Sequence, residues 1–142
     1  MAGKAGTARK KAGRIAAFLC ENSAWKAYVD AVGEGAEASR TLRELDAVKL
    51  PCSGKVEVGL ILKLLENGSA GVLVLGCPKD NCTFIRGNYR AEKRVGAAKA
   101  ALREAGLDEG LVRLDFLSSL DSRKLIDAVV SFKGHIDDHS RS

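Results

Sequence analysis

Short apolar runs alternate with longer amphipathic stretches along this chain of 142 residues. Two runs, IAAFLC at 15–20 and AGVLVLG at 70–76, are apolar or glycine at every position, which is typical of parallel strands buried on both faces. Two other runs, LDAVKL at 45–50 and LVRLDFL at 111–117, contain charged residues. We expect all four to be strands, with the two charged ones at the edges of the sheet.

Between these runs, apolar residues recur at the spacing of helices. The four predicted helical faces contain Trp25, Tyr28 and Val32; Val58, Ile61, Leu62 and Leu65; Ala91, Val95, Ala98, Leu102 and Ala105; and Leu125, Val129, Phe132 and Ile136. Gly68 and Gly106 suit C-terminal caps, and Asn88 suits an N-terminal cap. Residues 33–44 fit either a loop or a short helix.

The alternation of strands and helices predicts a single-domain α/β protein with a parallel sheet. Central apolar strands and charged edge strands give about four strands in the order 2-1-3-4, a truncated flavodoxin-like or Rossmann-like arrangement. The length of 142 residues agrees with one domain. We place this domain at residues 15–136, between a basic flexible tail at 1–14 and a polar C-terminal end at 137–142.

The formal net charge of +5 arises in the predicted tail. Residues 1–14 contain basic but no acidic side chains, and the remaining basic residues balance the 18 acidic ones. A nucleic-acid-binding domain usually carries its basic patch on the fold, so we expect no nucleic-acid partner. No segment approaches the roughly 20 apolar residues of a membrane span. We therefore expect a cytoplasmic protein whose thiols stay reduced.

All four cysteines fall where predicted strands end. Cys20 ends the first strand, Cys52 follows the second by two residues, and Cys77 and Cys82 bound the segment CPKDNC after the third. The carboxyl ends of parallel strands share one edge of a sheet, and ligands bind there where the strand order reverses. Here that point lies between the first and third strands. We therefore expect the four thiols to come together.

The residues alone leave several uses for these thiols open. Any single cysteine is compatible with core packing, and the pair Cys77 and Cys82 with a reversible disulfide or a reactive thiol. Four thiolates can hold zinc or an iron–sulfur cluster. A flavin or nucleotide site is less favoured, because no phosphate-binding loop is present. No Ser/His/Asp set suggests a catalytic site, and His135 and His139 lie far from every cysteine in the sequence.

The stretch CSGKVEVGLILKLLENGSAGVLVLGCPKDNCTFIRGNYRAEKRV at 52–95 resembles the delta subunit of methyl-viologen-reducing hydrogenase, an iron–sulfur protein that works beside heterodisulfide reductase. The matching features are Cys52–Ser53–Gly54, the strand from Gly71 to Val74, Gly76–Cys77 with Cys82, and Gly87–Asn88–Tyr89 with Ala91 and Arg94. A weaker likeness continues through residues 111–132, so the resemblance covers about two thirds of the chain.

This resemblance implies an electron carrier without a catalytic site of its own, with one 2Fe–2S cluster on Cys20, Cys52, Cys77 and Cys82. The implied partners are a flavin-containing subunit of the heterodisulfide-reductase type, and a dehydrogenase or hydrogenase-type subunit that donates or accepts electrons. The family commonly has another cysteine just after the first strand, where this chain has Glu21–Asn22–Ser23. Four thiolates still suffice for a cluster. The alternative interpretation is a zinc-stabilised structural adaptor in a multi-protein complex.

Overall fold

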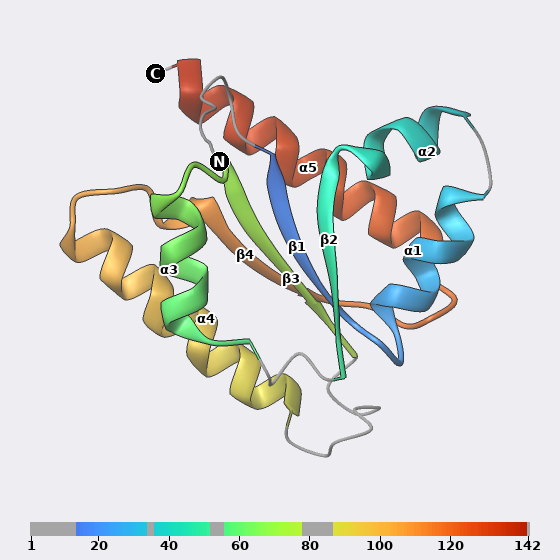
Figure 1. Cartoon of the computed structure of the whole chain (residues 1–142), viewed down its shortest axis with the longest axis horizontal. Coiled ribbons are helices and arrows are strands. Elements are labelled where there is room, and N and C mark those ends of the chain that lie inside the picture. The colour runs from blue at the N-terminus through green and yellow to red at the C-terminus, as the bar shows by residue number, and fades with distance from the viewer. Residues whose placement is uncertain (1–13, 34–35, 52–55, 78–86, 142) are drawn as a thin grey trace.

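The computed structural model describes residues 14–33, 36–51, 56–77 and 87–141 (Figure 1). The elements in these ranges are β1 (Ile15–Cys20), α1 (Ala24–Val32), α2 (Ala36–Arg43), β2 (Leu45–Leu50), α3 (Val58–Glu66), β3 (Gly71–Gly76), α4 (Gly87–Glu104), the 3-10 helix η4 (Glu109–Leu111), β4 (Val112–Phe116) and α5 (Ser122–Arg141). Every predicted strand and helix is present. The ambiguous stretch at 33–44 contains a helix, α2.

The strands form one parallel sheet in the order β2-β1-β3-β4, which confirms the predicted topology. Every residue of β1 and β3 is buried, whereas β2 and β4 at the edges are largely half-buried or exposed. Parallel neighbours need crossover connections, and the intervening helices supply them. The single-domain α/β fold expected from the sequence is therefore correct.

Helices cover both faces of the sheet, with α1, α2 and α5 on one face and α3 and α4 on the other (Figure 1). Because side chains alternate along a strand, Ala17 and Leu19 of β1 belong to the first layer and Ala16 and Phe18 to the second. Burial on both sides explains why the central strands tolerate no polar side chain.

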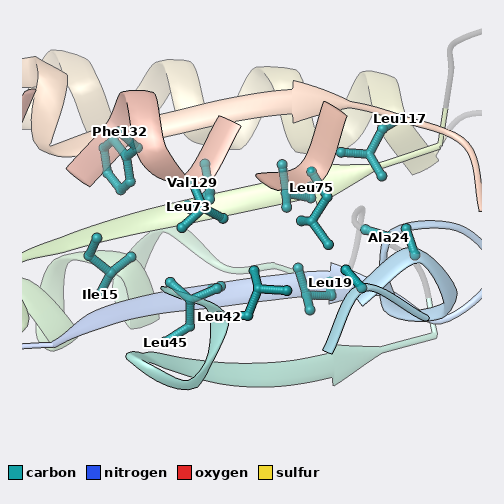
Figure 2. Packing of buried hydrophobic residues seen from close by; sticks show 14 of the residues in the cluster. Ile15, Leu19, Ala24, Leu42, Leu45, Leu73, Leu75, Leu117, Val129 and Phe132 are labelled. Carbon is teal, nitrogen blue, oxygen red and sulfur yellow. The ribbon is translucent and has the colours of Figure 1, made fainter. Parts of the chain in front are cut away.

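The first layer shows where helical spacing alone was misleading. Figure 2 shows Val129 of α5 lying over Leu73 of β3, within a cluster that also takes side chains from β1 and α1. The fully buried residues of α1 are Ala24, Ala27 and Ala31, and the predicted Trp25, Tyr28 and Val32 are only partly buried. Both sets follow helical spacing, and the small alanines occupy the face in contact with the core.

The second layer follows the prediction more closely. The α4 helix buries four of the five expected residues, Ala91, Val95, Ala98 and Leu102. Ala105 lies past the end of the helix and is exposed. The predicted cap at Asn88 is wrong, because the helix already begins at Gly87. On α3, Ile61 is fully buried and the other expected residues are partly buried.

Two glycines end helices as predicted. Gly106 has a φ of +77°, and its N–H donates to the carbonyl of Arg103 at 3.0 Å, while Leu107 N–H donates to Leu102 at 2.8 Å. This pair of hydrogen bonds is a Schellman motif, which needs a left-handed residue at the position of Gly106. Gly68, with a φ of +106°, ends α3 with the same pair of bonds.

The last helix buries all four expected residues, Leu125, Val129, Phe132 and Ile136. It continues through Arg141, so the polar C-terminal end expected from residue 137 belongs to this helix. No helix within the described ranges is long and apolar enough to cross a membrane.

Arg14, which we expected in the basic tail, is bound to the fold. Its Nε donates to Asp46 Oδ1 at 2.7 Å, and its NH2 group donates to the carbonyls of Arg43 at 2.7 Å and Leu45 at 3.1 Å. Its own carbonyl accepts a hydrogen bond from Ala70 N–H at 3.0 Å. Arg14 therefore contacts the fold, although it lies one residue before the predicted start of the domain. Residues 1–13 of the expected tail lie outside the described residues.

Gly71 allows α5 to approach β3 closely, and its replacement tests this packing. A Cβ there would clash with Ile136 Cδ1 and would lie 2.8 Å from Phe132 Cζ and 3.1 Å from the carbonyl oxygen of Leu111. We expect Gly71→Ala to lower the free energy of unfolding in urea by about 1–3 kcal/mol through overpacking. Gly96→Ala, in open space on α4, should raise it by about 0.5–1 kcal/mol. Equal effects of the two substitutions would contradict this account.

The contacts of Arg14 predict different effects for two changes at the N-terminus. Arg14→Ala should lower the free energy of unfolding by about 1 kcal/mol, because it removes several hydrogen bonds and an exposed ion pair. Deletion of residues 1–12 should leave Tm nearly unchanged. Arg123→Ala is the matched control. It should change the free energy of unfolding little, because the Arg123 side chain is largely exposed and its Nε lies 3.7 Å from Asp127 Oδ1. A deletion as destabilising as Arg14→Ala would show that the tail supports the core.

Candidate metal centre

Two of the four cysteines meet at the carboxyl edge of the central strands. Cys20 is the last residue of β1, and Cys77 directly follows β3. Their Sγ atoms are 3.4 Å apart, and the residues are only 2% and 4% exposed. Neither thiol is in a disulfide. The strand order reverses between β1 and β3, so this pair lies at the predicted binding position.

The distance between the two sulfurs fits a shared metal site. A disulfide bond is about 2.0 Å long, far shorter than the observed separation. Two thiolates on one tetrahedral metal ion, each about 2.3 Å from it, lie about 3.8 Å apart. The observed 3.4 Å is close to that value, and in the protonated state either thiol can donate to the other.

Cys52 and Cys82, the other two predicted ligands, lie outside the described residues. Within the described ranges, no group of three or more His, Cys, Asp or Glu side chains is arranged to hold a metal ion. The end of β2, which leads toward Cys52, is nevertheless beside Cys20. Leu50 pairs with Cys20 in the sheet, and its carbonyl accepts a hydrogen bond from Glu21 N–H at 2.7 Å.

A buried hydroxyl follows Cys20 in the turn before α1. Ser23 N–H donates to the carbonyl of Cys20 at 3.2 Å, and Ser23 itself is 3% exposed. It occupies the N-cap position of α1, yet its side chain makes no capping hydrogen bond. Its Oγ has no hydrogen-bond partner at all. In the sequence this position stood out only because it lacks a cysteine, and nothing there showed that the hydroxyl is buried.

Charged side chains border this edge of the sheet at its surface. Lys49, next to Leu50 on β2, lies 3.9 Å from Glu21 and 5.6 Å from the centre of the Trp25 ring. Such a position over an aromatic ring attracts a cation. The ring of Tyr28 lies 5.3 Å from that of Trp25. Lys49 of β2 therefore contacts both the turn after Cys20 and the first turn of α1.

The loop after β4 reaches the same edge. Leu117 N–H donates to the carbonyl of Gly76, the residue before Cys77, at 2.9 Å. Farther along this loop, Ser118 N–H donates to the carboxylate of Asp121 at 3.0 Å. This bond and a second one from the Ser118 hydroxyl lower the pKa of Asp121 below its usual value of 3.8. The carboxylate is therefore negatively charged at neutral pH and keeps the loop folded on itself.

Arg94 connects the two segments that follow the undescribed cysteines. It lies on α4, after Cys82 in the sequence, and its NH1 group donates to the carbonyl of Val56 at 2.9 Å. Val56 is 1% exposed and is the first described residue after Cys52. In the sequence Arg94 is one feature of the family resemblance, and its contact with Val56 is visible only in the structure.

The chain is similar to several known proteins over most of its length. Residues 15–138 match the family model described as "Methyl-viologen-reducing hydrogenase, delta subunit". An iron-sulfur subunit of the F420-non-reducing hydrogenase vhu of Methanopyrus kandleri is 35% identical over 116 residues, which cover 81% of this chain and 85% of that protein. The subunit of the same name in Methanocaldococcus jannaschii is 30% identical over 123 residues, with coverage of 87% and 90%.

A second kind of relative is much longer. One subunit of the ferredoxin/F(420)H(2)-dependent CoB-CoM heterodisulfide reductase of Methanosarcina acetivorans is 31% identical over 124 residues, or 87% of this chain. The chain spans only 15% of the length of that protein and of a similar one from Methanosarcina mazei. By their names, the relatives are therefore subunits of hydrogenases and heterodisulfide reductases. The family match over residues 15–138 shows that this chain belongs to the methyl-viologen-reducing hydrogenase delta subunit family.

Proposed function

We propose that this protein is an electron-transfer subunit that carries one 2Fe–2S cluster on Cys20, Cys52, Cys77 and Cys82. The observation that carries the proposal is the buried pair of Cys20 and Cys77, whose sulfurs lie 3.4 Å apart where the strand order reverses. Buried thiols so close together at the edge of a rigid sheet fit adjacent ligands of a cluster. The family membership supports the same use.

The positions of the other two cysteines in the sequence agree with this proposal. Cys52 follows Leu50 by two residues, and two residues extend a chain by at most about 7 Å. Leu50 is the residue that pairs with Cys20. Cys82 lies in a C-x₄-C segment with Cys77, a spacing that also occurs in plant-type 2Fe–2S proteins. These two thiolates would complete a set of four.

The protein would contribute position and environment to electron transfer. When bound, the cluster supplies a reversible one-electron couple. Cys20 ends a strand that pairs with both β2 and β3, and Cys77 directly follows β3. Burial of both residues would keep water away from the sulfurs. The α1 helix begins directly after the turn that follows Cys20, so the positive end of its dipole lies at the edge where thiolate charge would gather.

The proposed role requires partners, because a carrier must receive and deliver electrons. Two such partners are supported by the names of the relatives, which include subunits of a hydrogenase and of a heterodisulfide reductase. We infer a flavin-containing, heterodisulfide-reductase-type subunit on one side and a hydrogenase or dehydrogenase-type subunit on the other. The protein itself would have no catalytic site, and the complex would work in the cytoplasm.

The metal content of anaerobically purified protein tests the proposal. We expect brown protein with visible absorbance and about two irons and two sulfides per chain, as a 2Fe–2S cluster requires. Replacement of any one of the four cysteines by serine should lose the cluster or distort its spectrum. Ser131→Ala, on the exposed face of α5, is the control and should keep both the cluster and its spectrum unchanged. Unchanged iron and spectra in Cys20→Ser would remove Cys20 from the site, and colourless protein with bound zinc would support the adaptor interpretation instead.

The contact between Arg94 and Val56 predicts how firmly the cluster is held. Arg94→Ala should lower the free energy of unfolding by about 1 kcal/mol, because a hydrogen bond to a buried carbonyl is lost. It should also release iron to a chelator several-fold faster than the unmodified protein, since the segments after Cys52 and Cys82 are no longer joined there. Arg103→Ala, on the same helix with an exposed ion pair to Glu109, is the control. Equal rates of iron release in the two variants would contradict this role.

A further inference from the structure

Buried polar side chains normally form hydrogen bonds, and the hydroxyl of Ser23 is an exception to this rule within the described part of the chain. It is the one buried side-chain nitrogen or oxygen atom there that has no hydrogen-bond partner. Leaving a buried hydroxyl without a partner costs about 1–3 kcal/mol, so such groups call for an explanation. One common explanation is a partner that the polypeptide itself does not supply.

The usual use of a serine at this position does not account for its burial. A serine at the N-cap normally accepts a hydrogen bond from a backbone N–H in the first turn of the helix. Ser23 makes no such bond, although it precedes α1 directly. The hydroxyl therefore remains available as a donor as well as an acceptor.

The reactive groups nearest to Ser23 along the chain belong to the thiol pair of Cys20 and Cys77. Ser23 is held one turn from Cys20, because its N–H donates to the carbonyl of Cys20 at 3.2 Å. Cys20 in turn has its sulfur 3.4 Å from that of Cys77. All three residues are less than 5% exposed, so each of them is largely shielded from water. In such surroundings a thiolate or sulfide is an acceptor, and a hydroxyl is the matching donor.

We propose that the Ser23 hydroxyl donates a hydrogen bond to a sulfur of the metal centre held by Cys20 and Cys77 and thereby raises its reduction potential. This inference rests on the proposed function and deepens it. Reduction adds negative charge to the sulfurs, and a donated hydrogen bond stabilises that charge more in the reduced state than in the oxidised state. Ser23 is thus a tuning residue and not a ligand, so its loss should leave the iron content unchanged.

The test compares midpoint potentials of the full-length, cluster-loaded protein and its variants. Ser23→Ala should shift the reduction equilibrium about tenfold toward the oxidised form, which is a potential lower by about 59 mV for a one-electron couple. Ser23→Gly should give the same shift, since glycine is tolerated at an N-cap. Ser23→Thr, which keeps the hydroxyl, should restore most of the potential. Ser69→Ala, before β3 at the opposite edge of the sheet, is the matched control and should have no effect.

An exchangeable proton provides a second measurement that a purely structural role would not affect. In the reduced protein, pulsed EPR in H₂O and D₂O should detect an exchangeable proton coupled to the centre, and this signal should be absent from Ser23→Ala and Ser23→Gly. Without the cluster, Ser23→Ala should be at least as stable as the unmodified protein, because it removes an unpaired buried hydroxyl.

The outcomes separate this inference from the proposed function. Variants that load iron and sulfide normally, with unchanged potential and proton coupling, would overturn the role of Ser23 alone. A threonine variant that behaves like the alanine variant would overturn it as well. Unmodified protein that takes up no iron or sulfide would overturn the proposed function, and the role of Ser23 with it.

Discussion

The parallel pairing of β1 with β3 is the constraint on which the rest of the structure depends. These strands are buried on both faces, and their register places Leu19 opposite Leu75. That register brings Cys20, at the end of one strand, beside Cys77, just past the end of the other. Side chains alternate between faces along a strand, so a slip of one residue would exchange the two hydrophobic layers and separate the thiols. The pairing that forms the core of the sheet therefore also brings the two thiols together.

Because the fold depends on the pairing of its central strands, its topology could be predicted from the sequence. Uninterrupted apolar runs identify central parallel strands, and charges identify edges, so the strand order follows from four short segments. Because all four cysteines follow strand ends, the rule that such ends share one edge was enough to bring Cys20 and Cys77 together. Cys52 and Cys82 lie outside the described residues, so the proposal that they belong to the site rests on sequence position and family membership.

Other features depend on contacts that spacing does not encode. In α1, an alanine stripe and an aromatic stripe have the same period, and only packing against the sheet shows that Ala27 faces the core and Trp25 its margin. Arg14 is one of several basic residues in its stretch, and it is distinguished by its hydrogen bonds to β2 and the residues before it. The burial of Ser23 has no counterpart in the sequence. Each of these properties belongs to a pair of distant segments and not to a local pattern.

The two edges of the sheet have different surroundings. At the amino edge, Gly71 of β3 lies against Ile136 near the end of α5, and the backbone of Arg14 bonds to Ala70. The first and last parts of the described fold thus lie together, at the edge away from Cys20 and Cys77. Polypeptide joined before Arg14 or after α5 would therefore start from the edge opposite the two thiols. This geometry makes the fold suitable as a module within longer chains, and the heterodisulfide reductase relatives, in which the matching segment is 15% of the length, are proteins of that kind.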